Sequence, residues 1–250
     1  MRYRSAVLGA IAASLAPAAS ADQVSVSVSP AYAAGDFGQT DDTRIYYLPV
    51  QWRYDHGPWS AAVTAAWLSV QGPVVLTSGG VSGGTTVSTE RRSGAGDTWL
   101  EGSYRVGGGG AAPDTVPYLK IKFATADAER GLGSGEHDYE SGVSLEWAVS
   151  GGWFPFVSAG YRRVGEPDGF PVRDIAVYEA GLSYRLAGSH YLTGMFAGNQ
   201  SALADAPRAA DLVLAWNRAA GTGVGIQLYA SVGLSDGSPD YSLGFSLEWR

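Results

Sequence analysis

The fold is decided by the stretch Tyr241-Ser242-Leu243-Gly244-Phe245-Ser246-Leu247-Glu248-Trp249. Large apolar side chains occupy every second position, and serine, glycine or glutamate stands between them. Successive side chains of a β-strand point to opposite faces, so this segment has one apolar and one polar face. Its length suits a tilted strand that crosses a lipid bilayer, which takes about 9–11 residues.

The same alternation recurs through most of the chain. Val24, Val26 and Val28 alternate with serines, and the segment 46–54 alternates in the same way. Twelve candidate strands result, near residues 23–32, 44–54, 59–69, 97–106, 116–125, 138–149, 153–163, 174–186, 190–199, 211–219, 223–233 and 241–249. The pattern predicts an all-β fold, a 12-stranded antiparallel transmembrane β-barrel of the bacterial outer membrane.

The predicted connections alternate between short and long. Short turns follow the second, sixth, eighth and tenth strands, and a longer glycine run follows the fourth. Longer polar loops follow the first, third, fifth, seventh and ninth strands, the longest over residues 71–96, and the last connection, 234–240, is a compact Gly/Pro turn. Outer-membrane barrels sort their loops between two ends in this way, and a soluble β-sandwich has no reason to do so. Tyr and Trp at the strand ends indicate two aromatic girdles. We therefore expect both termini in the periplasm.

The first 21 residues read as a cleaved signal peptide. Arg2 and Arg4 precede a short apolar run, and Ala19-Ser20-Ala21 is a small-residue cleavage pattern. The run is too short to span a bilayer. The predicted barrel then covers residues 22–250, and loss of the two arginines takes the net charge from −7 to −9.

Composition narrows the function classes. The chain has 35 glycines, no cysteine and a net charge of −7, which argues against nucleic-acid binding. Without cysteine, an exported chain draws its stability from something other than disulfides. Barrel closure supplies it, because every ladder hydrogen bond is made.

Several ordered motifs resemble the meta-pathway phenol-degradation family of bacterial outer-membrane proteins. They are Gly96-Asp97-Thr98-Trp99-Leu100-Glu101-Gly102-Ser103-Tyr104-Arg105, Lys120-Ile121-Lys122-Phe123-Ala124-Thr125-Ala126-Asp127, Gly131-Leu132-Gly133-Ser134-Gly135, Gly160-Tyr161-Arg162 and Gly233-Leu234-Ser235-Asp236-Gly237-Ser238-Pro239-Asp240. The family has Pro-Thr-Gly-Asp where this chain has Ala124-Thr125-Ala126-Asp127. The resemblance covers about residues 94–250. It implies an outer-membrane barrel that admits small, often aromatic, molecules.

Alternation assigns a set of polar and aromatic side chains to the barrel lumen. The lumen-lining candidates are Gln51, Arg53, Trp99, Glu101, Ser103, Arg105, Lys120, Lys122, Glu140, Ser144, Glu146, Glu179, Arg185, Gln227, Tyr229 and Glu248. A turn centred near Ala111 and Ala112 would place Glu101 opposite Lys122. The candidates fit either a polar channel for solutes or salt bridges that fill a closed barrel. Paired charges of both signs predict a small conductance with weak ion selectivity.

Enzyme chemistry is weakly supported. A barrel lipid hydrolase needs a histidine beside a serine on one strand face. His56, His137 and His190 lie in or beside predicted turns and loops, so we predict no catalytic residues, and the hydrolase stays the weakest alternative. A non-conducting structural or surface barrel is the other.

The predicted loops also carry many acids, namely Asp36, Asp41, Asp42, Asp127, Glu129, Glu136, Asp138, Glu166, Asp168 and Asp174. They read as solvated charge, or as ligands for Ca²⁺ or for lipopolysaccharide bridged by divalent ions. We predict no metal site and no cofactor. The expected partners are outer-membrane lipids, lipopolysaccharide, a small-molecule solute, and the barrel-assembly machinery through the C-terminal strand.

Overall fold

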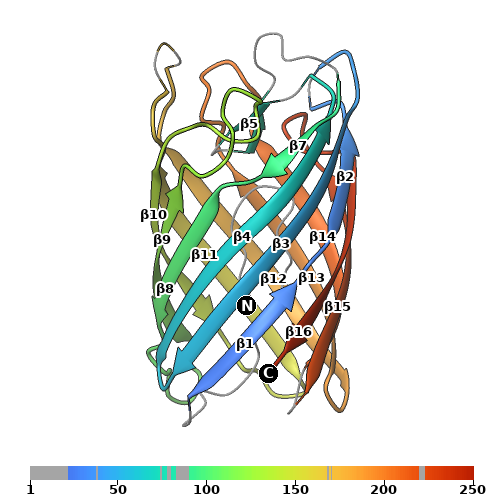
Figure 1. Ribbon diagram of the computed structural model, residues 1–250. Helices are drawn as coiled ribbons and strands as arrows, with labels where there is room; N and C mark the ends of the chain where they lie inside the picture. The colour runs from blue at the N-terminus through green and yellow to red at the C-terminus, as the bar shows by residue number, and fades with distance from the viewer. Residues whose placement is uncertain are drawn as a thin grey trace.

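The chain forms a closed antiparallel β-barrel (Figure 1). The computed structural model describes residues 22–37, 39–73, 75–77, 80–82, 90–167, 169, 171–219 and 223–250. The predicted signal peptide, residues 1–21, lies outside the described residues. In the described part of the chain, no helix is long and apolar enough to cross a membrane.

The predicted 12-stranded barrel is confirmed. Two barrel strands are each built from two pieces, β1 (Gln23–Val28) with β2 (Ala31–Gly35) and β7 (Arg92–Ala95) with β8 (Thr98–Tyr104). The others are β3 (Thr43–His56), β4 (Trp59–Gln71), β9 (Asp114–Phe123), β10 (Asp138–Glu146), β11 (Trp153–Arg163), β12 (Ile175–Ala187), β13 (His190–Asn199), β14 (Ala209–Arg218), β15 (Val224–Gly233) and β16 (Tyr241–Trp249). A separate hairpin, β5 (Val75–Thr77) and β6 (Gly80–Ser82), belongs to the long loop after β4.

The barrel closes where β16 pairs with both β1 and β2. Val26 faces Trp249 in one part of this seam, and Ala34 faces Tyr241 in the other. The first strand breaks at Pro30 because proline has no N–H to donate to a ladder. Its carbonyl still accepts a 3.1 Å hydrogen bond from the backbone N–H of Phe245. The seam therefore leaves the barrel without an open edge.

The outer surface has the character of a lipid-facing wall. Outward positions carry exposed large apolar side chains, among them Leu119, Leu182, Leu212, Leu214, Leu228, Leu243 and Phe245. Aromatic pairs stand at both ends of this band. The ring centroids of Trp59 and Tyr104 lie 4.6 Å apart near the short turns, and those of Tyr32 and Tyr46 lie 4.9 Å apart near the long loops. Amphipathic rings favour the boundary between membrane and water.

The two ends of the barrel differ as predicted. At the lower end in Figure 1, tight connections such as Gly57-Pro58 join neighbouring strands, and β1 begins and β16 ends there. The strand ends that face the longer connections lie at the upper end, and these connections span residues 36–42, 72–91, 124–137, 164–174, 200–208 and 234–240.

Two details of the predicted fold are wrong. The fourth strand begins at Arg92 rather than near residue 97, because β7 continues the pairing with β4 beyond the interruption at Gly96 and Asp97. Glu101 also pairs with Lys120 instead of Lys122. The turn between β8 and β9 is closed by a 3.1 Å hydrogen bond from Ala112 N–H to Gly109 O and is centred at Gly110 and Ala111, where Gly110 has a φ of +62° that glycine adopts readily. This centre lies one residue before the predicted one, so the register differs by two residues.

Candidate functional site: the charged inner wall

Charged side chains gather on the inner wall formed by β8, β9, β10 and β11. Along these strands buried or half-buried positions alternate with exposed ones, so the less exposed side chains face the barrel interior. Lys120, Lys122 and Glu140 are buried, and Trp99 and Glu101 are half-buried. We call this surface the charged wall.

The middle of the charged wall is a row of alternating sign. The strand register places Glu101, Lys120, Glu140 and Arg162 side by side on four successive strands. Lys120 Nζ lies 3.3 Å from Glu101 Oε2, and Arg162 Nη2 lies 2.7 Å from Glu140 Oε2. Opposite charges on directly neighbouring strands stabilise a sheet, and a buried charge needs such a partner.

Aromatic rings cover the same row. The Arg162 guanidinium lies 5.3 Å, and Lys120 Nζ 5.9 Å, from the centroid of the Trp99 ring, at cation–π distance. The Tyr118 hydroxyl donates a 3.0 Å hydrogen bond to Glu140 Oε1. Glu140 therefore accepts hydrogen bonds on both carboxylate oxygens.

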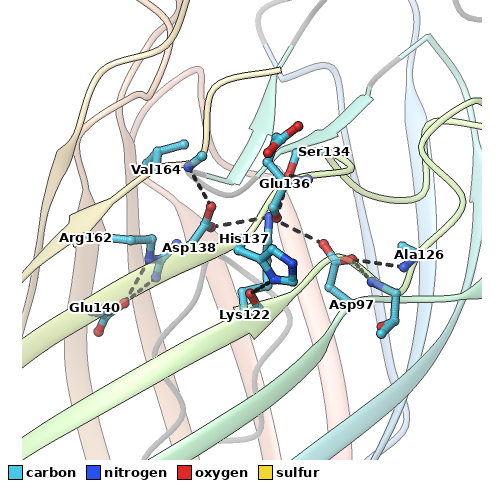
Figure 2. A network of polar contacts seen from close by, with 12 residues as sticks. Asp97, Lys122, Ala126, Ser134, Glu136, His137, Asp138, Glu140, Arg162 and Val164 are labelled. Carbon is cyan, nitrogen blue, oxygen red and sulfur yellow. Dashed lines mark hydrogen bonds and ion pairs between the residues drawn. The ribbon is translucent and has the colours of Figure 1, made fainter. Parts of the chain in front are cut away.

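A second cluster lies nearer the long loops, centred on Lys122 (Figure 2). Its ammonium lies 3.4 Å from Asp97 Oδ2 and 3.3 Å from Asp138 Oδ2, and it donates a 2.6 Å hydrogen bond to Ser134 Oγ. Asp138 Oδ1 accepts a 3.0 Å hydrogen bond from the backbone N–H of Gly165. Asp138, predicted to be solvated loop charge, is instead completely buried because it pairs with Lys122 at the start of β10.

A third cluster lies near the short turns. Arg105 Nη1 is 2.8 Å from Asp114 Oδ2 and 3.2 Å from Glu146 Oε2. On β3, Arg53 Nε lies 3.0 Å from Asp55 Oδ1. The three clusters follow the charged wall from one end of the barrel toward the other.

Just outside β1, the Asp22 carboxylate forms a hydrogen bond with the His56 ring. This bond, together with a hydrogen bond from Tyr54, lowers the pKa of Asp22.

Other predicted lumen residues are spread around the barrel. Arg185 is exposed near the short turns, where its guanidinium lies 5.5 Å from the Phe154 ring, and Glu248 lies beside Arg250 at the end of β16. Glu179 is half-buried between Ser158 and Ala197, while Tyr229 is buried with its ring against Gly244. The remaining ones carry amides or hydroxyls. These are Gln51, Ser103, Ser144 and Gln227.

Away from the charged wall, buried inward positions hold two kinds of side chain. Small hydroxyl side chains include Ser25, Ser27, Ser29, Thr64, Ser183, Thr193, Ser231, Ser242 and Ser246. Some of them bond in pairs across neighbouring strands, as Ser29 does with Ser246 at 2.8 Å. Apolar side chains form a cluster that includes Ile45, Leu68, Val70, Met195 and Val213. The interior is thus asymmetric, with charge on one side and hydroxyl and apolar side chains on the other.

Sequence reasoning missed four charged members of the charged wall as lumen residues. Asp114 falls just before the predicted fifth strand, outside its alternation, but belongs to β9 and pairs with Arg105. Asp97 stands in the gap between β7 and β8, where no alternation exists to assign it a face. Asp138 was assigned to a loop. Arg162 could have been assigned to the interior from the sequence, because it lies on the same face of β11 as Ser158 and both side chains are buried.

The three histidines make separate contacts, that of His56 being with Asp22. His137 Nδ1 lies 3.3 Å from the backbone oxygen of Lys122, and the His190 ring packs on Trp216. Among the described residues, no group of three or more histidine, cysteine, aspartate or glutamate side chains is arranged to hold a metal ion.

Comparison with known proteins identifies the fold. No protein-family model matches the chain, and no curated protein matches it. The COG4313 outer membrane channel from Pseudomonas putida F1 superposes with a TM-score of 0.69 at 10% identity, over 90% of this chain and 94% of that one. The fold is that of an outer-membrane β-barrel.

Two further solved structures agree with this fold. The NanC porin gives a TM-score of 0.60 at 9% identity, over 90% of this chain and 99% of its own. The translocator domain of the autotransporter NalP from Neisseria meningitidis gives 0.56 at 13% identity, over 91% and 88%.

Proposed function

We propose that this outer-membrane barrel is a passive channel for small molecules, aromatic ones among them. One observation carries the proposal, namely that three clusters of paired charge follow a single inner wall toward both ends of the barrel. Around them the outer surface is apolar. One side of the interior is therefore polar along the direction in which a solute would cross the membrane.

Stability alone gives little reason for this wall. Replacing a buried ion pair by well-packed apolar side chains is often neutral or stabilising, so a barrel that needed only a filled interior gains nothing from Arg162 and Glu140. Paired charges do offer a solute hydrogen-bonding groups of both kinds without a strong field of one sign. They support a conducting interior with weak ion selectivity.

The family resemblance bears on the same wall. Asp97, Glu101, Lys120, Lys122 and Arg162 all belong to motifs that resemble the meta-pathway phenol-degradation proteins, and they meet in two neighbouring clusters. We infer membership of that family from this convergence. The similarity of the fold to the COG4313 outer membrane channel and the NanC porin supports a transport function.

The shape of the barrel supports a proposed orientation and a proposed set of partners. We place the short turns and both ends of the barrel in the periplasm, with the long loops facing outward toward lipopolysaccharide. Outer-membrane lipids cover the apolar band. The alternating strand β16 supplies the signal for the barrel-assembly machinery.

Swelling of liposomes tests the transport function. Refolded protein of residues 22–250 should let arabinose enter liposomes, and boiled protein should not. If folded protein admits no sugar, the channel proposal fails and a non-conducting barrel takes its place. Release of fatty acids from the same liposomes, abolished in His137→Ala, would instead establish a hydrolase.

A further inference from the structure

The loop of residues 124–137 packs into the barrel instead of extending from it. Its tip, Gly131-Leu132-Gly133, is buried, and Leu132 is only 1% exposed. Leu132 belongs to an apolar cluster with Ile45 of β3 and Val70 of β4, both of which face inward. A leucine at the tip of a long polar loop can be buried only if other parts of the barrel pack against it.

That wall includes β7. A Cβ atom placed on Gly94 would lie 2.9 Å from Leu132 Cδ1, so the leucine rests directly on the glycine backbone. Gly94 pairs with Leu68, which is buried on the inner face of β4. The loop therefore takes up part of the cross-section at the long-loop end of the barrel.

Polar contacts at the base of the loop join it to the charged wall (Figure 2). Asp97 Oδ1 accepts hydrogen bonds from the backbone N–H groups of Thr125 at 3.1 Å and Ala126 at 3.0 Å. Lys122 contacts the C-terminal half of the loop. Its ammonium lies between Asp97 and Asp138 and donates a 2.6 Å hydrogen bond to Ser134 Oγ. The ammonium thus combines one hydrogen bond to the loop with ion pairs to two carboxylates.

We propose that Lys122 is a positioning residue that holds loop 124–137 in the mouth of the barrel, where the loop sets the largest solute that passes. The proposal rests on the proposed transport function. Lys122 is 2% exposed, so it acts through the loop and does not contact the solute. An apolar constriction beside polar walls selects by size and by the ease with which a solute loses water.

The test compares Lys122 with a cation that lies outside the charged wall. In Lys122→Met the loop loses its ammonium anchor, whereas in Arg163→Met the charge lost belongs to an exposed side chain on the outer face of β11. Liposome swelling with arabinose, sucrose and raffinose measures the exclusion size with uncharged solutes. We expect the raffinose-to-arabinose rate ratio to rise several-fold in Lys122→Met and to keep its wild-type value in Arg163→Met.

An engineered disulfide shows whether the change in the swelling ratio comes from displacement of the loop or from loss of the lysine charge. The chain has no cysteine, so Gly94→Cys with Leu132→Cys introduces a single pair at a direct contact. Added to Lys122→Met, the oxidised pair should return the ratio to the wild-type value, and reduction should raise it again. An unchanged ratio in folded Lys122→Met overturns the proposal.

Two further measurements keep the proposal testable in every case. If Lys122→Met does not fold, Ser134→Ala removes only the loop's acceptor and should still raise the ratio; a wild-type ratio would overturn the proposal. If the wild type passes no sugar, the transport function fails separately. The yield of the Gly94→Cys, Leu132→Cys cross-link then decides, since it should fall in Lys122→Met and an equal yield refutes the anchor.

Discussion

Arg162 Nη2 lies 2.7 Å from Glu140 Oε2, and the two side chains are 1% and 0% exposed. They stand on neighbouring strands, in the same row as Lys120 and Glu101. The Tyr118 hydroxyl bonds to the second oxygen of Glu140, so the carboxylate has partners on both sides. This buried pair lies in the middle row of the charged wall.

Removing one partner of this pair should destabilise the barrel. Glu140→Gln leaves the Arg162 charge buried beside a neutral amide, and breaking a buried pair in this way costs about 3–5 kcal/mol. Urea unfolding of the protein in detergent measures the change. The double variant Glu140→Gln, Arg162→Met removes both charges and should recover part of the loss. Equal stabilities of wild type and Glu140→Gln would show that the pair contributes nothing.

A side chain added at either of the two glycines that contact Tyr118, Gly142 and Gly160, should destabilise the barrel. A Cβ on Gly160 would lie 2.0 Å from the Tyr118 hydroxyl oxygen, and one on Gly142 would lie 2.2 Å from it. Gly160→Ala should therefore displace the tyrosine, break its bond to Glu140 and lower stability by roughly 1–3 kcal/mol. The same unfolding measurement applies.

Gly194→Ala is the matched control on β13, because a Cβ there meets nothing within 4 Å. It should leave the urea midpoint unchanged. Combining Gly160→Ala with Tyr118→Leu should restore part of the lost stability. If Gly160→Ala matches the control, the ring does not lie on this glycine.

Protease added to intact cells should distinguish the two ends of the barrel. We expect cleavage within residues 71–96, in the long loop 72–91 between β4 and β7, and none within 107–114, in the turn between β8 and β9. Mass spectrometry of the fragments locates the cut. Cleavage at 107–114 alone would reverse the proposed orientation, and cleavage at both would mean that the membrane protects neither end.

Removing the charge of Glu101, the half-buried residue at the end of the row of alternating charges, should change the ion selectivity of the channel. Glu101 is paired with Lys120, and its replacement by glutamine leaves one excess positive charge beside the interior. The reversal potential in a KCl gradient should then shift toward anions. Asp41→Asn, in an exposed loop, should leave it unchanged. No shift in Glu101→Gln would mean that this row does not border the ion path.

The barrel was predictable from sequence because strands such as 241–249 repeat one alternation that a bilayer imposes on every crossing. Parity also assigned Lys120 and Glu140 to the interior. The pairing of residues between strands was harder to predict. The turn at Gly110 lies one residue earlier than the predicted turn, so Glu101 pairs with Lys120 instead of Lys122. Asp97 and Leu132 lie outside regular strands, where neither period nor register assigns a face, so the loop in the mouth was not foreseen.

Single-channel recording of the refolded protein in planar bilayers tests the central claim most directly. A conducting barrel with a paired charged wall should give small, discrete current steps whose size rises with KCl concentration, with a reversal potential close to zero in a salt gradient. Protein that is folded and inserted, as shown by its altered gel mobility before boiling, yet gives no steps at any salt concentration would contradict the channel and leave a filled barrel.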